Sequence, residues 1–302
     1  MRLAVILLTV TSSLTLSAQQ ADKRPIPPPS NDTVGIDIDR FIGNPFQSLT
    51  RVIHEVMLSR SILRHGDPHV PGDPGAVLEY RKDFALVWLM ASNRTPLTEL
   101  EDQQIFYVVR GEGRLDTDRD YWDLKPGIAV LIPPKARHRF SNDGNESLEM
   151  LRLVWENPPG VIPRSDILVR DVNALPFAEQ NAHWSYMAKN LFHPNDGLHP
   201  NEKILIVYLP LMSIGSPHAH VPHWEEVWTT LPPGEGSYLQ LGSETREWGA
   251  YSGYLVPPNA RTVHSSMNMS KDKMVEYFYF GRYTQPAPNP EDEPSVAPTP
   301  LP

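Results

Sequence analysis

The chain has 302 residues, 40% of them hydrophobic and 21% charged, a balance typical of globular proteins and enough for one large domain or two of ordinary size. A formal net charge of −9, without a cluster of Lys and Arg, argues against nucleic acid as a partner. Because the sequence contains no cysteine, disulfides, thiolate metal sites and a cysteine nucleophile are excluded, and any metal must be bound by histidines and carboxylates.

The two ends of the sequence differ in composition from the body. Arg2 precedes an apolar run from Leu3 to Val10, and Ala18 supplies a small residue at a cleavage position. This pattern predicts a signal peptide over residues 1–18 and export to the periplasm or the medium, with no membrane anchor after cleavage. We expect a Pro-rich leader over residues 19–33 and a disordered tail over residues 284–302, where seven prolines alternate with acidic residues.

The body between the leader and the tail contains mostly short apolar segments. Residues 51–64 fit either an amphipathic helix or a strand, because several apolar positions carry β-branched side chains. The later segments are bounded by Pro or Gly and predict strands near residues 84–90, 105–109, 128–133, 148–155, 203–212, 251–256 and 274–280. This pattern predicts an all-β sandwich or barrel.

The body also repeats itself. Residues 103–106 followed by Gly-Glu-Gly at 111–113 are similar to residues 225–228 followed by Gly-Glu-Gly at 234–236. Residues 130–134 are similar to residues 254–258, and both end in Pro-Pro. Because the two matches occur in the same order at nearly equal separation, we expect two copies of one barrel, over residues 34–165 and 166–283.

Two short patterns within these copies resemble the motifs of the cupin family. The pattern G-x10-H-x3-N occurs at Gly127, His138 and Asn142, and again at Gly253, His264 and Asn268. The pattern H-x-H followed by an acidic pair occurs only in the second copy, at His218-Ala219-His220 and Glu225-Glu226. The resemblance implies two double-stranded β-helix (jelly-roll) barrels, as in two-domain bicupins, with a metal bound inside the barrel by His, His, Glu and His.

The resemblance assigns the metal ligands of the second copy to His218, His220, Glu226 and His264. Glu225 is an alternative ligand or a general acid or base, but strand neighbours face opposite sides. The internal repeat aligns Glu226 with Gln104, which favours Glu226 as the ligand. Imidazoles and one carboxylate suit a divalent Fe, Mn, Ni, Cu or Zn ion and suit Ca²⁺ poorly. His223 lies between the ligands in the sequence. It is either a partner of a ligand, an alternative ligand or a surface loop side chain, and we favour the surface position.

The first copy lacks this ligand set. Thr98, Leu100 and Gln104 occupy the positions of two imidazoles and the carboxylate, so His138 alone cannot hold a metal. We therefore expect a structural barrel with a degenerate metal site, in which His138 is an interior side chain. Whether this barrel binds a ligand stays open.

Three functions agree with this sequence. The first is a metal-dependent enzyme for a small oxygenated molecule, of dioxygenase, oxidase or decarboxylase type, with O2 as a partner. The second is a non-redox isomerase or lyase, and the third is a non-catalytic binding protein. Family frequency favours oxygen-dependent oxidation, and assembly into a homo-oligomer is compatible with each of the three.

Overall fold

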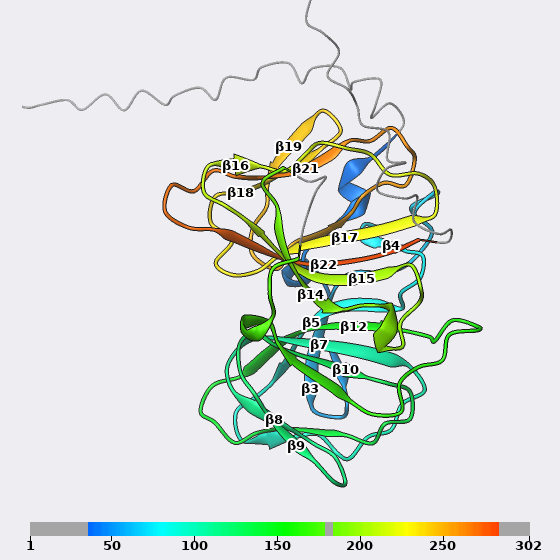
Figure 1. The fold of residues 1–302 in the computed structure, drawn as a ribbon, viewed down its shortest axis with the longest axis vertical. Coiled ribbons are helices and arrows are strands. Elements are labelled where there is room, and N and C mark those ends of the chain that lie inside the picture. Colours follow the sequence, from blue (N-terminus) through cyan, green and yellow to red (C-terminus); the bar gives the residue numbers. More distant parts are fainter. Residues whose placement is uncertain (1–35, 179–183, 284–302) are drawn as a thin grey trace, which may run out of the picture.

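The computed structural model describes residues 36–178 and 184–283, which form two β-sandwich barrels (Figure 1). The predicted signal peptide, leader and tail lie outside these residues. Within these two ranges, regular helix is limited to four short 3₁₀ turns, at Ile38–Phe41, Pro45–Gln47, Val172–Ala174 and Pro194–Asp196. No helix in the described ranges is long and apolar enough to cross a membrane.

The first half contains one large and one small sheet. The large sheet has the order β13-β10-β7-β12-β5-β3-β2, with β4 paired to β3, and the small sheet has the order β6-β11-β8-β9. The strands of the large sheet are β2 (Arg51–Ile53), β3 (Met57–His65), β4 (Ala76–Leu78), β5 (Asp83–Leu89), β7 (Gln103–Arg110), β10 (Ile128–Ile132), β12 (Leu148–Trp155) and β13 (Leu168–Asp171). Those of the small sheet are β6 (Asn93–Arg94), β8 (Gly113–Asp116), β9 (Tyr121–Leu124) and β11 (Arg139–Asn142).

The second half repeats this arrangement. Its large sheet has the order β1-β20-β17-β22-β15-β14, and its small sheet has the order β16-β21-β18-β19. The large-sheet strands are β1 (Ile42–Gly43), β14 (Met187–Phe192), β15 (Glu202–Leu209), β17 (Trp224–Thr230), β20 (Gly253–Leu255) and β22 (Val275–Tyr283). The small-sheet strands are β16 (Ser213–Ile214), β18 (Ser237–Leu241), β19 (Glu244–Glu247) and β21 (His264–Asn268).

The all-β architecture with two jelly-roll barrels agrees with the expectation from the sequence. Residues 51–64 form the β2–β3 hairpin rather than a helix. Their alternating burial explains the choice, because every second side chain of the first part of β3 is buried.

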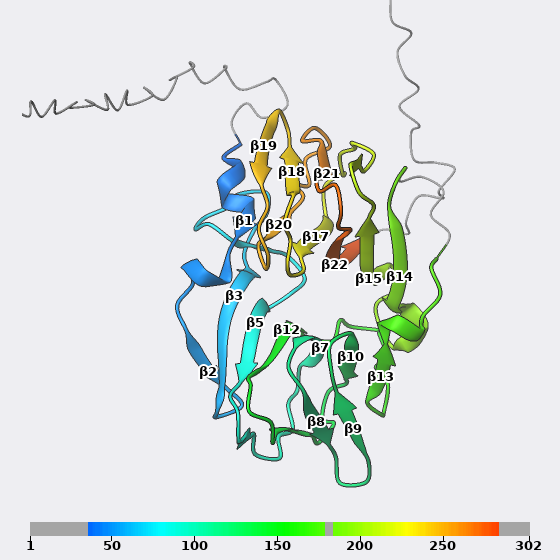
Figure 2. The same ribbon diagram turned by 90° about the vertical axis from the view of Figure 1, so that its left-hand side faces the viewer.

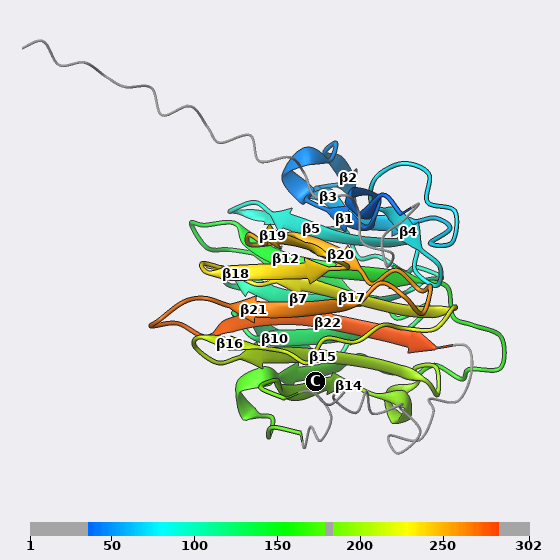
Figure 3. The same cartoon turned by 90° about the horizontal axis from the view of Figure 1, so that it is seen from above.

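The two large sheets pack against each other, and the small sheets lie on the outer sides (Figures 1 and 2). Seen from above, the strands of the two large sheets run in nearly the same direction (Figure 3). The interface is apolar and includes Phe84 of β5 stacked on Phe278 of β22, with ring centroids 5.8 Å apart. Each barrel also has its own core between its large and small sheet. A central strand such as β7 is therefore buried on both faces, and Ile105 and Tyr107 face the interface while Phe106 and Val108 face the barrel interior.

The two halves exchange their leading strands. Strand β1 pairs with β20 of the second half, and β13, which precedes the second barrel, pairs with β10 of the first (Figure 2). The expected boundary between the barrels, at residues 165 and 166, therefore does not describe β1 and β13, because each of these strands pairs with the barrel of the other half. Gly43 of β1 is required there, because a Cβ atom at this position would lie 1.7 Å from the carbonyl oxygen of Ile62.

Candidate metal centre

Four side chains from three parts of the second half converge inside its barrel. His218 and His220 follow β16, Glu226 belongs to β17, and His264 begins β21. Two backbone hydrogen bonds hold His218 and His264 side by side. The His218 N–H donates to the carbonyl oxygen of His264 at 3.2 Å, and the His264 N–H donates to that of His218 at 2.8 Å. Strand alternation directs Glu226 into the barrel together with Trp228.

The donor atoms of these four residues all lie within 4.8 Å of one another. The Nε2 atom of His264 is 3.3 Å from Nε2 of His218 and 3.2 Å from Nε2 of His220. The Glu226 carboxylate oxygens lie 3.0 Å from Nε2 of His220 and 3.4 Å from Nε2 of His264.

These separations fit a shared ion. An ion with bonds of about 2.1 Å places neighbouring ligand atoms about 3.0 Å apart at 90° and about 3.4 Å apart at the tetrahedral angle. The four measured distances, from 3.0 to 3.4 Å, fall in that range. His220, Glu226 and His264 are at most 3% exposed, and His218 is half-buried, so His218 lies nearest to solvent.

Neighbouring groups orient the imidazoles. His218 Nδ1 lies 2.8 Å from the carbonyl oxygen of Ser216, which requires the proton on Nδ1 and leaves the Nε2 lone pair for a metal. His264 Nδ1 lies 3.0 Å from the Tyr254 hydroxyl, which accepts the Nδ1 proton in the same tautomer. The Trp224 ring packs on His220 with centroids 4.4 Å apart.

The Glu226 carboxylate is held ionised and in place. Burial alone would raise its pKa, but while the imidazoles are protonated, the charge and hydrogen bond of His220, followed by the charges of His264 and His218, hold the pKa of Glu226 well below its usual range. Trp228 Nε1 donates to Oε1 at 2.6 Å, and the Tyr279 hydroxyl donates to Oε2 at 3.0 Å. The carboxylate is thus an anionic group with a fixed orientation, suited to bind a cation.

Sequence reasoning did not identify Tyr254 and Tyr279 as partners of the ligands. The only signal in the sequence was that both lie in predicted strands, near residues 251–256 and 274–280. Tyr279 pairs with Trp228 across β17 and β22, two residues from Glu226. Phe278, the strand neighbour of Tyr279, faces the interface between the halves.

Glu225 faces the opposite side of β17. It is 2% exposed, and its Oε2 accepts a hydrogen bond of 2.8 Å from the backbone N–H of Tyr80 in the first half. Burial raises the pKa of Glu225, and the charge of Arg81 opposes that rise. The structure therefore brings Glu226 to the imidazoles and places Glu225 at the contact between the halves. There Glu225 faces away from the imidazole cluster, so it is not positioned to act as a general acid or base at that site.

The first half has the same backbone framework without the ligands. Thr98 and His138 exchange backbone hydrogen bonds of 2.8 and 2.9 Å, as His218 and His264 do. Gln104 accepts a hydrogen bond of 2.8 Å from Arg152, as Glu226 does from Tyr279. His138 is 1% exposed, and burial is the main reason that its pKa is lowered, so it is a neutral interior side chain.

Comparison with known proteins identifies the same fold. A family model described as a cupin domain matches residues 94–155, in the half without the ligand set. Acireductone dioxygenase from Tuber melanosporum is 32% identical over 90 residues, which are 26% of this chain and 52% of that protein. The chain spans about half the length, or less, of the curated relatives it matches.

Two solved structures resemble both halves together. The 7S globulin of Momordica charantia has a TM-score of 0.59 and 15% identity, over 82% of this chain and 85% of that one. Oxalate decarboxylase from Lactobacillus farciminis, in a formate complex, has a TM-score of 0.57 and 12% identity, over 80% of this chain and 86% of that one. Residues 94–155 therefore match a cupin domain, and the chain as a whole shares the two-barrel fold of these structures.

Proposed function

We propose that the second barrel binds one divalent transition metal and uses it for oxygen-dependent oxidation of a small oxygenated organic molecule. The observation that carries this proposal is the convergence of three imidazole Nε2 atoms and one ionised carboxylate at metal-ligand spacing. The names of the similar proteins, a dioxygenase and a decarboxylase, support metal-dependent chemistry of this class.

The residues of the site would have two kinds of role, metal binding and support of the ligands. His218, His220, Glu226 and His264 would hold the ion, and a bound Fe, Mn, Ni or Cu would supply open positions for substrate and dioxygen. Tyr279 and Trp228 fix the carboxylate, while the Trp224 ring covers His220 and limits access of water.

The position of Glu225 favours oxidation over the lyase or isomerase alternative. Such reactions need a side chain that moves a proton to or from the substrate. The sequence offered Glu225 for this role, and its carboxylate faces the first half instead.

Metal content and oxygen consumption test the proposal. The untagged protein should retain about one Fe, Mn, Ni or Cu ion per chain. The His220→Ala variant should lose that ion, and His138→Ala should keep it because His138 stands in the barrel without ligands. An oxygen electrode would then follow turnover with hydroxy acids, keto acids and enediols. Equal metal loss in both variants, or no metal under any loading condition, would contradict the proposal.

A non-catalytic binding protein is the second candidate, and similarity to a 7S globulin over both halves favours it. Stable metal retention without oxygen consumption would support this alternative. We also propose export to the periplasm or the medium, and sequencing of the mature N-terminus tests this, since cleavage after Ala18 should leave Gln19 first.

A further inference from the structure

A second cluster of metal-binding side chains lies outside the barrels. His69 comes from the loop between β3 and β4, Glu79 follows β4, and His223 precedes β17. Their donor atoms all lie within 4.8 Å of one another. The cluster therefore joins one segment of the first half to the short loop of the second half that connects His220 with Glu226.

The carboxylate of Glu79 lies beside both imidazoles. Its Oε1 lies 3.1 Å from His223 Nδ1, and its Oε2 lies 4.0 Å from His69 Nε2. The two imidazole rings are in contact, with centroids 4.8 Å apart. The side chains are 34%, 27% and 55% exposed for His69, Glu79 and His223, so small rotations can bring the longest separation to the roughly 3.0–3.5 Å that one ion requires.

The backbone around the cluster is held by contacts between the halves. The Tyr80 hydroxyl donates to the carbonyl oxygen of His223 at 3.0 Å, and the Tyr80 N–H donates to Glu225. His223 itself has a φ of 66°, a left-handed conformation that is uncommon for a non-glycine residue. The imidazole of His223 is thus directed to Glu79 by a constrained loop.

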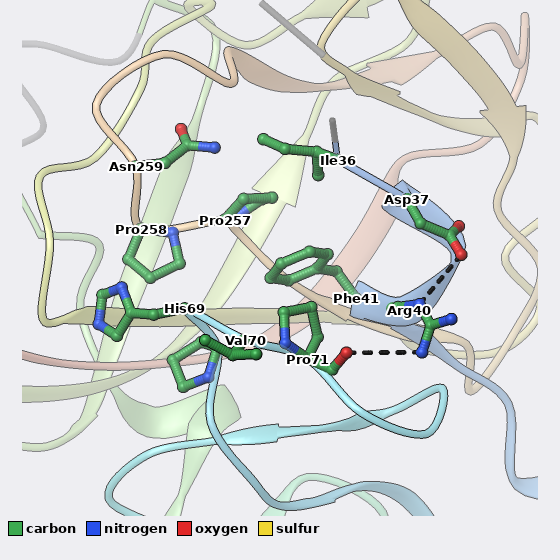
Figure 4. A pocket seen from close by; sticks show the side chains of 11 residues that line it. Ile36, Asp37, Arg40, Phe41, His69, Val70, Pro71, Pro257, Pro258 and Asn259 are labelled. Carbon is green, nitrogen blue, oxygen red and sulfur yellow. Dashed lines mark hydrogen bonds and ion pairs between the residues drawn. The ribbon is translucent and has the colours of Figure 1, made fainter. Parts of the chain in front are cut away.

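We propose that His69, Glu79 and His223 form a second site for a divalent late transition metal. Two imidazoles and one carboxylate favour Zn²⁺, Ni²⁺ or Cu²⁺ over Ca²⁺ and Mg²⁺. Three protein ligands leave at least one position for water or a small ligand, and His69 also borders a cavity of about 370 Å³, beside Pro258 (Figure 4). The ion would link the first half to the loop that carries ligands of the inner site.

Zinc stoichiometry tests the proposal on the full, untagged chain. After removal of metal with a chelator, the protein is dialysed against micromolar Zn²⁺, and bound zinc is measured by mass spectrometry. His220→Ala, which disables the inner site, should still bind about one ion, and addition of His223→Ala or Glu79→Gln should abolish that binding. His65→Ala, an exposed histidine outside both clusters, is the matched control and should change nothing.

The results separate the two sites. If His220→Ala binds no zinc while His223→Ala retains one ion, the outer cluster is only an ion pair between His223 and Glu79, and the proposal is wrong. If His220→Ala binds one zinc ion while His223→Ala binds none, the outer site is supported and the proposed inner metal site is contradicted. Thermal unfolding tests the link between the halves: Zn²⁺ should raise the Tm of His220→Ala but not that of His220→Ala/His223→Ala, and an unchanged Tm in both would overturn the link.

Discussion

Replacement of Arg81 by Met should strongly destabilise the contact between the two halves. Arg81 lies between β4 and β5, and its guanidinium forms an ion pair with Glu202 at the start of β15. Both side chains are fully shielded from solvent. The guanidinium also lies over the Trp155 ring, 4.8 Å from its centroid.

The expected cost follows from the charge that is left behind. Removing one partner of a buried ion pair costs about 3–5 kcal/mol, because the other charge stays buried without compensation. Here the variant removes the ion-pair partner of Glu202 and also removes the positive charge that opposes the rise in the pKa of Glu225. Exchange of both partners for apolar residues, in Arg81→Met/Glu202→Met, should recover much of the loss.

The loss should depend on pH in a defined direction. Burial raises the pKa of Glu225 in the folded protein, and the charge of Arg81 partly offsets this, so removal of Arg81 raises the pKa further. A folded state with a raised carboxyl pKa binds more protons than the unfolded state, and its stability falls as pH rises above the ordinary glutamate pKa of about 4.3. The deficit of Arg81→Met should therefore be smaller at acidic pH than at neutral pH.

Urea unfolding at pH 5.5 and 7.5, followed by tryptophan fluorescence, measures both effects. Arg64→Met is the matched control, because Arg64 forms a solvent-exposed ion pair with Asp73 and should cost less than about 1 kcal/mol. Equal destabilisation by the two substitutions, or a deficit for Arg81→Met that does not grow between the two pH values, would refute this reasoning.

Three further substitutions test other parts of the structure. Tyr279→Phe removes the hydrogen bond to Glu226 and should weaken metal retention by about 10–100-fold in competition with a chelator; unchanged retention would show that this contact does not orient the ligand. Asn268→Ala deprives two backbone carbonyl groups of their donor and should cost about 2 kcal/mol in urea unfolding, whereas a neutral result would contradict a structural role. Gly43→Ala should displace β1 from β20, because the new Cβ would clash with Ile62, and limited proteolysis near residue 43 should become faster; wild-type resistance would argue against this.

The sequence predicted the features that depend on local patterns. Strand alternation and the internal repeat favoured Glu226 over Glu225, and the structure places these two carboxylates on opposite faces of β17. The repeated backbone bonds at Thr98 and His218 likewise follow from the aligned motifs.

The features that the sequence missed depend on contacts between distant segments. β1 has only two residues, too few to show a period, and its partner β20 lies more than 200 residues away. His69 matches no ligand spacing, and His223 lies among the inner-site residues 154 positions further along the chain, so only the packing of the two halves brings the two histidines together. The positions of Tyr254 and Tyr279 are equally tertiary, because a strand pattern gives the face of a side chain but not its hydrogen-bond partner.

The reciprocal exchange of β1 and β13 has a consequence for the origin of this fold. A gene encoding either half alone would produce a barrel with an unpaired sheet edge and an unattached leading segment. In a dimer of two identical copies with a twofold axis, the leading segment of each copy could pair with the open sheet edge of the other. The present arrangement is therefore what fusion of a strand-swapped homodimer would leave behind, with one copy free to lose its ligands because the other still carries them.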